Sequence, residues 1–221
     1  MTTVFSHIKA RALALFLACC ICFTALQPSE SFAEPAWPQD VLIEAEGGIL
    51  VDADSGTVLY GKNIHQRYYP ASITKILTAL IVIERCKLDD TITFSYDAVH
   101  NVESGSTSAG YGVGDKITVR EALYALLLRS ANEVANALAE HCAGSREAFA
   151  RLMNEKAASL GCKESHFTNP SGLNDENHYT TAYDYSLIAM AAFKNPTFVE
   201  FDSTTYYELP PNSANAEPFT I

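Results

Sequence analysis

The sequence is short of basic residues. Lysine and arginine together number 15 among 221 residues, against 26 aspartates and glutamates, which gives a formal net charge of −11. Nucleic-acid backbones are bound by basic surfaces, so this balance argues against a nucleic-acid partner. The length and the 48% of hydrophobic residues are typical of a globular protein with one good core.

Cysteines are too few and too scattered to form a framework. Three of the six fall in the first 33 residues: Cys19, Cys20 and Cys22. The other three, Cys86, Cys142 and Cys162, are an odd number without metal-ligand spacing. No disulfide framework or metal site is predicted from them, although one disulfide pair is possible outside the cytosol.

The chain also lacks an apolar run long enough to cross a membrane. The longest one, Ala12 to Leu26, has 15 residues, whereas a helical span needs roughly 20. Lys9 and Arg11 precede it, and a small-x-small pattern ending at Ala33 follows. This layout predicts a secretory signal peptide over residues 1–33, cleaved after Ala33, rather than a membrane anchor. A lipoprotein site at Cys19 is disfavoured because it would fall inside the run.

Turn residues divide the rest of the chain into strands followed by helices. A hairpin is predicted from the apolar runs Gly48–Asp52 and Thr57–Tyr60, which residues 53–56 separate. Helices are predicted over 71–85, where the residues are mostly apolar, and over about 133–141. Capping and stop signals predict three more, from the capping box Thr118–Glu121, from Ser145 to Gly161, and from Thr181 to Asn195-Pro196. Residues 198–209 are predicted to be extended. This order indicates an α+β fold with a helical lobe inserted after the first strands.

One lysine is unexpected in the helix over 71–85. From Ile73 onward nearly every residue is aliphatic or small, as in a buried helix, yet Lys75 lies in the first turn. Ser72 is three residues earlier, so its hydroxyl and the amine share one face and can meet. Burial and the positive end of the helix favour a neutral amine, a base that makes the hydroxyl nucleophilic. Alternatively, Ser72 caps the helix and Lys75 extends to solvent.

A second hydroxyl and a carboxamide stand at the junction of two predicted helices. They are Ser130 and Asn132, two residues apart. Capping would account for both. However, Ser-x-x-Lys followed downstream by Ser-x-Asn is the ordered motif set of penicillin-binding proteins and class A β-lactamases.

With these motifs the chain resembles the serine-type D-alanyl-D-alanine carboxypeptidases, the low-molecular-mass penicillin-binding proteins. The resemblance runs from about residue 45 to 200. Its segments are similar to the first hairpin of the family, its nucleophile helix, its second motif and a downstream segment: Ile49–Tyr60, Tyr69–Lys75, Leu126–Asn132, and Asn169–Leu173 with His178–Asp184.

The resemblance implies a fold and a division of the chain. The fold is that of penicillin-binding proteins and β-lactamases, α+β, with an antiparallel sheet flanked by helices plus a helical lobe. Residues 34–221 would be a partial catalytic domain, with the lobe over about 86–195.

The resemblance also implies a reaction and its residues. Ser72 would attack the carbonyl between the two terminal D-alanines of a peptidoglycan stem peptide and form an acyl-enzyme. Lys75 would take its proton, Ser130 would relay a proton to the leaving D-alanine, and Asn132 would hold the peptide amide. No metal or organic cofactor is implied, β-lactams would inhibit, and the site of action would be the extracytoplasmic face of the bacterial membrane and the cell wall.

In one respect the chain departs from the family. The third motif, Lys-Thr-Gly, occurs nowhere in the 221 residues. In the family that region supplies a cation for the substrate carboxylate, an oxyanion N–H and the remaining strands of the sheet. We therefore expect a fragment with an incomplete sheet, an unpaired hairpin edge and a partly uncovered helix 71–85. A membrane contact through a missing C-terminal anchor is conceivable on the same ground.

This departure also gives expectations for the chain by itself. Losing one oxyanion donor costs roughly 10²–10³ in rate. We expect poor solubility and no hydrolysis of a D-Ala-D-Ala peptide at this length.

Three other functions fit parts of the pattern. A non-catalytic penicillin-binding or sensor module would keep the fold without turnover. A class A-like β-lactamase would share Ser72, Lys75, Ser130 and Asn132, but the stretch 166–173 holds no deacylating acid. A Ser-His-Asp hydrolase using His100 or His178 is disfavoured because no Gly-x-Ser-x-Gly sequence is present.

Overall fold

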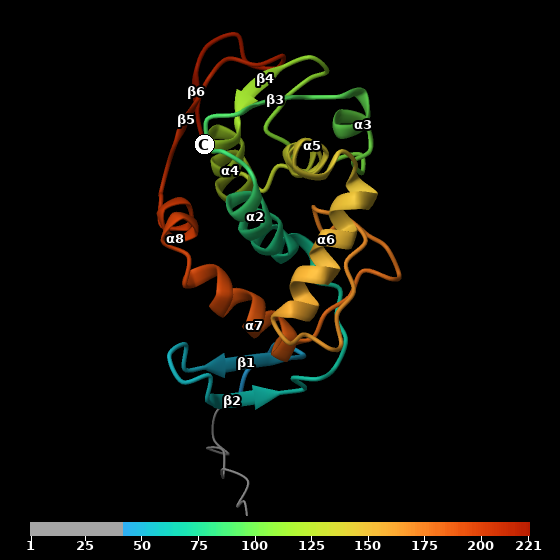
Figure 1. The fold of residues 1–221 in the computed structure, drawn as a ribbon, viewed down its shortest axis with the longest axis vertical. Coiled ribbons are helices and arrows are strands. Elements are labelled where there is room, and N and C mark those ends of the chain that lie inside the picture. Colours follow the sequence, from blue (N-terminus) through green and yellow to red (C-terminus); the bar gives the residue numbers. More distant parts are fainter. Residues whose placement is uncertain (1–41) are drawn as a thin grey trace, which may run out of the picture. The chain divides into compact units, whose positions relative to one another are not determined.

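The computed structural model describes residues 42–221. The predicted signal peptide and its cleavage after Ala33 lie outside the described residues. In Figure 1 a hairpin stands beside helix α7, and helices α4, α5, α6, α7 and α8 pack around helix α2. Within residues 42–221 no helix is both long and apolar enough to span a bilayer.

The predicted hairpin is present. Strand β1 (Gly48–Val51) pairs antiparallel with β2 (Val58–Lys62), and a register shift occurs between Leu50 and Val51. Asp52 starts the turn by accepting bonds from the N–H and the hydroxyl of Ser55. Among the described residues each of these strands has a single partner, as predicted for an open edge.

The helix predicted over residues 71–85 has two parts. Ala71–Ile73 form a short 3₁₀ turn, η1, and the α-helix α2 runs from Thr74 to Arg85. Ala71 adopts φ +49°, a left-handed conformation that is costly for a residue with a Cβ. The candidate nucleophile, Ser72, therefore lies on the tight turn rather than on the regular helix.

The capping signals placed three helices correctly, and the helix predicted over about 133–141 is also present. Helix α4 (Val119–Leu128) begins with the complete capping box of Thr118 and Glu121. Helix α5 (Asn132–Ala143) follows after three residues and ends at Gly144. The side chains of Ser145 and Thr181 cap α6 (Arg146–Ser159) and α7 (Ala182–Phe193).

The prediction that residues 198–209 are extended was wrong over its first part. Helix α8 runs from Pro196 to Asp202. Asn195 accepts bonds from the N–H groups of Thr197 and Phe198, and Pro196 occupies the first helical position. An Asn-Pro pair therefore starts a helix here, because proline lacks only a donor that the first turn leaves unpaired.

Several short elements had no sequence signal that we recognised. They are β3 (Thr91–Thr93), which pairs with β4 (Lys116–Thr118), helix α3 (Tyr96–His100), and β5 (Glu208–Leu209), which pairs with β6 (Phe219–Thr220). Each strand has two or three residues, too few for an alternating pattern to stand out.

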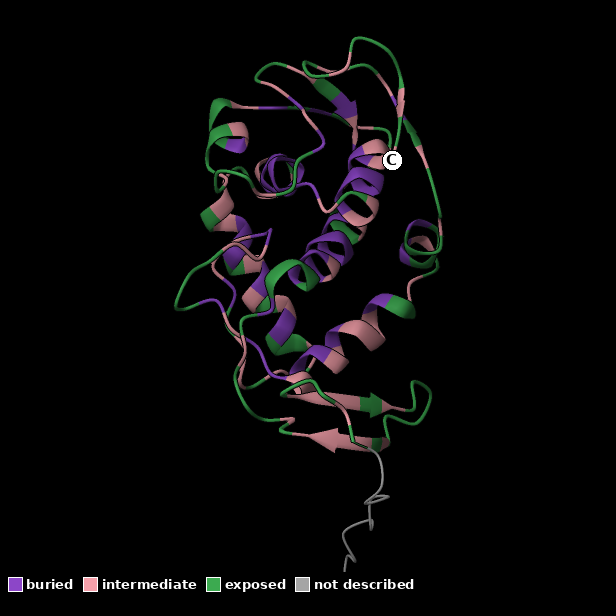
Figure 2. Ribbon diagram, turned by 180° about the vertical axis from the view of Figure 1, so that it is seen from behind, coloured by how far each residue is buried: buried purple, intermediate pink, exposed green. Residues whose placement is uncertain are grey.

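The core is built around α2. Its residues from Leu77 to Val82 are all at most 2% exposed, because the helix packs against α4, α5, α6, α7 and α8. In Figure 2 the buried class dominates α2, α4 and α5, whereas the hairpin is intermediate or exposed. The expectation that this helix would lose part of its cover was therefore wrong for its central turns.

Candidate active site

The Lys75 amine lies at the centre of the site. The residue is 2% exposed, and its Nζ lies 3.3 Å from Ser72 Oγ, 2.7 Å from Asn132 Oδ1 and 2.7 Å from the carbonyl oxygen of Ser171. A neutral amine has two N–H donors and one lone pair. If the amine donates to Asn132 Oδ1 and to the Ser171 carbonyl oxygen, its lone pair remains free to accept the proton of the Ser72 hydroxyl. This arrangement suits a base.

The surroundings of Lys75 lower its pKa, so that a substantial fraction of the amine is neutral near neutral pH. Burial lowers the pKa of Lys75 from 10.5 to about 8, while the negative charge of Glu133 pulls it upward. About half of the amines are neutral at pH 8. The alternative in which this lysine extends to solvent is wrong.

Ser72 is exposed beside this base. Its side chain is not used to cap α2, since neither η1 nor α2 has a side-chain cap. The hydroxyl is thus available both to the amine and to a ligand arriving from solvent, which is the geometry of an activated nucleophile.

Asn132 contacts the Lys75 amine from a second helix, and Ser130 lies two residues before it in the chain. Asn132 is the first residue of α5, and its Nδ2 makes no hydrogen bond within residues 42–221. Ser130 is half-buried with φ +58°, a left-handed conformation. The hydrogen bonds thus join Ser72, Lys75 and Asn132, whereas none within the described chain involves the Ser130 hydroxyl.

Glu133 is a buried neighbour that the sequence analysis missed. It is 2% exposed, and its Oε1 accepts bonds from the Ser108 hydroxyl and the N–H groups of Ala109 and Gly110. Its Oε2 has no partner within the described residues. The carboxylate fastens the 108–110 loop to the start of α5 and supplies the negative charge that acts on Lys75.

The Ser171 carbonyl is held by a loop that Asn169 organises. Asn169 Oδ1 accepts from the N–H groups of Ser171, Gly172 and Leu173. Gly172 has φ +85°, and a Cβ there would stand 1.9 Å from the carbonyl oxygen of Ala71. The loop therefore lies directly on the turn that carries Ser72.

His178 forms a hydrogen bond with the first residue of α2, Thr74. Its Nδ1 is 3.1 Å from the N–H of Thr168, which must donate, so Nδ1 accepts and Nε2 carries the proton. Nε2–H then donates to Thr74 Oγ1 at 2.9 Å. This role is structural, and His178 makes no contact that fits a Ser-His-Asp arrangement with Ser72.

We expect His178 to make folding stability fall in mild acid. Burial, with a smaller contribution from His166, lowers its pKa from 6.5 to about 4, while the negative charge of Asp175 opposes the shift. Below pH 6.5 the imidazole is protonated in the unfolded chain, whereas in the folded chain it stays neutral down to about pH 4. The free energy of unfolding therefore falls by about 3 kcal/mol across this interval. Urea unfolding at pH 7 and pH 4 measures it. The loss should be smaller in His178→Gln and unchanged in His100→Gln, and equal losses in all three proteins would contradict this role.

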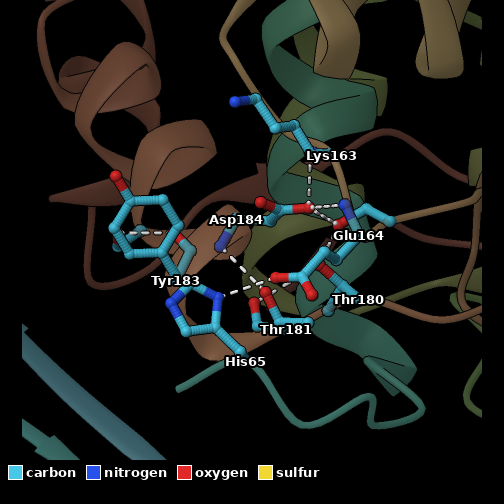
Figure 3. A network of polar contacts seen from close by, with 9 residues as sticks. His65, Lys163, Glu164, Thr180, Thr181, Tyr183 and Asp184 are labelled. Carbon is cyan, nitrogen blue, oxygen red and sulfur yellow. Dashed lines mark hydrogen bonds and ion pairs between the residues drawn. The ribbon is translucent and has the colours of Figure 1, made fainter.

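A buried carboxylate secures the start of α7. Figure 3 shows Asp184 among its donors: Oδ2 accepts from the N–H groups of Lys163 and Glu164 and from the Ser165 hydroxyl at 3.0, 2.7 and 2.8 Å. Thr181 caps the same helix. The segment after α6 is thereby fixed to α7 by charge-assisted bonds.

Residues 180–185 also bind the segment that precedes Ser72 by hydrogen bonds. The backbones of Tyr68 and Thr180 exchange two hydrogen bonds of 2.8 and 3.0 Å, and Tyr183 N donates to Ile64 O. The Tyr185 hydroxyl donates to the carbonyl of Ile73, directly after the candidate nucleophile. The turn at Ser72 is thus held from both sides.

Fold and site together define a class. An exposed serine on a tight turn, a buried lysine three residues later and an asparagine from a neighbouring helix form a Ser-Lys arrangement of the acyl-transfer hydrolases.

Comparison with known proteins identifies the family. Residues 33–217 match the family model described as D-alanyl-D-alanine carboxypeptidase. The chain belongs to this family. Its fold is that of the penicillin-binding DD-peptidases, as predicted: it superposes on the D-alanyl-D-alanine carboxypeptidase of Mycobacterium tuberculosis with a TM-score of 0.74 at 32% identity, covering 83% of this chain and 69% of that one.

Two curated relatives illustrate the extent of the match. The D-alanyl-D-alanine carboxypeptidase DacF of Bacillus subtilis is 37% identical over 166 residues, which cover 73% of this chain and 42% of the relative. DacA of Escherichia coli is 32% identical over 207 residues, which cover 88% of this chain and 51% of the relative. The chain spans about half the length of these relatives.

Proposed function

We propose that this protein is a serine-type D-Ala-D-Ala carboxypeptidase that removes the terminal D-alanine from peptidoglycan stem peptides through an acyl-enzyme on Ser72. The observation that carries the proposal is the Lys75 amine, buried and within 3.3 Å of the Ser72 hydroxyl. Family membership supports the substrate class.

The site residues would divide the reaction as follows. Lys75 takes the proton of Ser72 as its oxygen attacks the carbonyl between the two D-alanines. Asn132 offers Nδ2 to a substrate carbonyl while its Oδ1 holds the lysine. Ser130, two residues before Asn132 in the chain, passes a proton to the leaving D-alanine amine, and water then releases the shortened peptide.

The same proposal covers partners and location. Peptidoglycan stem peptides would be the substrate and β-lactams would acylate Ser72 in their place. The protein would act outside the cytoplasmic membrane, at the cell wall. Export through residues 1–33 remains part of this proposal.

Acylation by a β-lactam tests the proposal directly. The chain is incubated with a penicillin in excess, and its intact mass and peptides are measured over hours. We expect one lasting adduct on Ser72, formed slowly because no Lys-Thr-Gly is present. Ser72→Ala should form none, and the matched variant of an exposed serine, Ser203→Ala, should behave as the wild type.

Other outcomes would favour the remaining candidates. An adduct that is hydrolysed within minutes would indicate a β-lactamase. A lasting adduct fits both a carboxypeptidase and a sensor module, and release of D-alanine from a D-Ala-D-Ala peptide by a form carrying Lys-Thr-Gly distinguishes them. A chain that folds but remains unlabelled would refute the proposed function.

A further inference from the structure

Two cysteines stand at the ends of the packed helices α2 and α5. Cys86 caps the C-terminus of α2, and Cys142 lies in the last turn of α5. Helices α2 and α5 pack against each other, both cysteines are half-buried against the core, and each thiol lies near enough to act on the pKa of the other. The same helix ends also meet nearby, because His141 Nε2 lies 3.8 Å from Asp90 Oδ2. The catalytic arrangement uses neither thiol.

We propose that Cys86 and Cys142 form a disulfide bond when the protein is in an oxidising compartment, and that Cys162 stays a thiol. The inference rests on the export that the proposed function implies. Cys162 is excluded because its Sγ donates to the carbonyl of Asp184 at 3.3 Å. Burial also raises the pKa of Cys162 to about 12, so its reactive thiolate is scarce.

The chemistry requires a small-molecule or protein disulfide as the oxidant. The Cys142 thiol raises the pKa of Cys86, and the Cys86 thiol lowers the pKa of Cys142, so Cys142 is the thiol that attacks first. Its thiolate attacks the oxidant disulfide and expels one thiolate. Cys86 loses its proton and attacks the mixed disulfide, which expels the second thiolate. Two electrons thereby pass to the oxidant, and one S–S bond forms in the protein.

The position of this bond relates it to the candidate active site. Lys75 and Asn132 join α2 to α5 at the beginning of each helix. A bond between Cys86 and Cys142 would join the same two helices at their ends. It would close the chain that carries β3, α3, β4 and α4, as well as Ser130. The disulfide would therefore help to keep α5, which begins at Asn132, packed against α2, which carries Lys75.

Equilibration with a glutathione redox buffer tests the pair without using catalysis. The chain is incubated with oxidised and reduced glutathione at an extracellular-like ratio, free thiols are alkylated in acid and denaturant, and the peptides are mapped. We expect a linked Cys86–Cys142 peptide and an alkylated Cys162. The melting temperature should rise by roughly 5–10 °C over the reduced chain, since the closed loop is long.

Variants separate the pair from the third cysteine. Cys162→Ser should keep both the linked peptide and the rise in melting temperature, whereas Cys142→Ser should lose both. Three alkylated thiols in the wild type, a link that includes Cys162, or glutathione left attached to Cys86 or Cys142 would overturn the proposal. So would a linked chain that melts no higher than the reduced one. Thiol mapping of the wild type remains decisive if a variant does not fold.

Discussion

Replacement of Lys75 by methionine is expected to slow penicillin acylation of Ser72 by about 10³-fold. The methionine retains most of the apolar stem and removes the group that accepts the hydroxyl proton, and general bases contribute 10²–10⁴-fold. The adduct rate measured by mass spectrometry reports the effect. Lys194→Met, at an exposed lysine, is the matched control and should leave the rate unchanged.

The pH dependence distinguishes a base from a structural lysine. With a pKa of about 8, the acylation rate of the wild type should rise through pH 8 and then level off. Glu133→Gln removes the charge that raises this pKa, so the midpoint should move to lower pH. A flat profile, or an unshifted midpoint in a folded Glu133→Gln protein, would show that Lys75 does not titrate in the reaction.

Gly172→Ala is expected to be the most damaging single-methyl change near the site. The new Cβ would stand 1.9 Å from the backbone oxygen of Ala71 and 2.4 Å from its carbonyl carbon, so two backbone segments must separate. We expect a loss of several kcal/mol, of which the left-handed φ accounts for only about 1–2. Ser72 acylation should fall as well, because the turn moves. Urea unfolding and adduct formation measure the two effects.

Gly144→Ala provides the control for Gly172→Ala. Gly144 has φ +82°, close to that of Gly172, but a Cβ there meets nothing within 4 Å. Gly144→Ala therefore has the same cost of a positive φ as Gly172→Ala, but no steric clash of the added Cβ. Equal destabilisation by the two substitutions would show that the contact with Ala71 is unimportant.

The fold class and the central contact were predictable because they depend on local patterns. Ser72 and Lys75 are three residues apart on a helical segment, and caps such as Thr118 with Glu121 mark helix starts within four residues. Asn132 could be assigned because it belongs to a short ordered motif. Each of these signals lies in one stretch of sequence.

The remaining parts of the site depend on contacts between distant segments. Ser171 contributes a backbone carbonyl, which every residue type possesses, so nothing in its side chain indicates the bond to Lys75. Glu133 resembles an ordinary first-turn acid until the 108–110 loop folds onto it. Asn195-Pro196 was interpreted as a stop signal, although the same pair starts α8.

The loop over the nucleophile resists substitution at two adjacent positions, for a different reason at each. At position 171 the carbonyl holds the amine, and the buried hydroxyl donates to Asn169 Oδ1, so a larger side chain would disturb the loop. At position 172 even one added carbon collides with the turn beneath. Protein engineering that reshapes ligand preference therefore has to leave both of these adjacent positions unchanged.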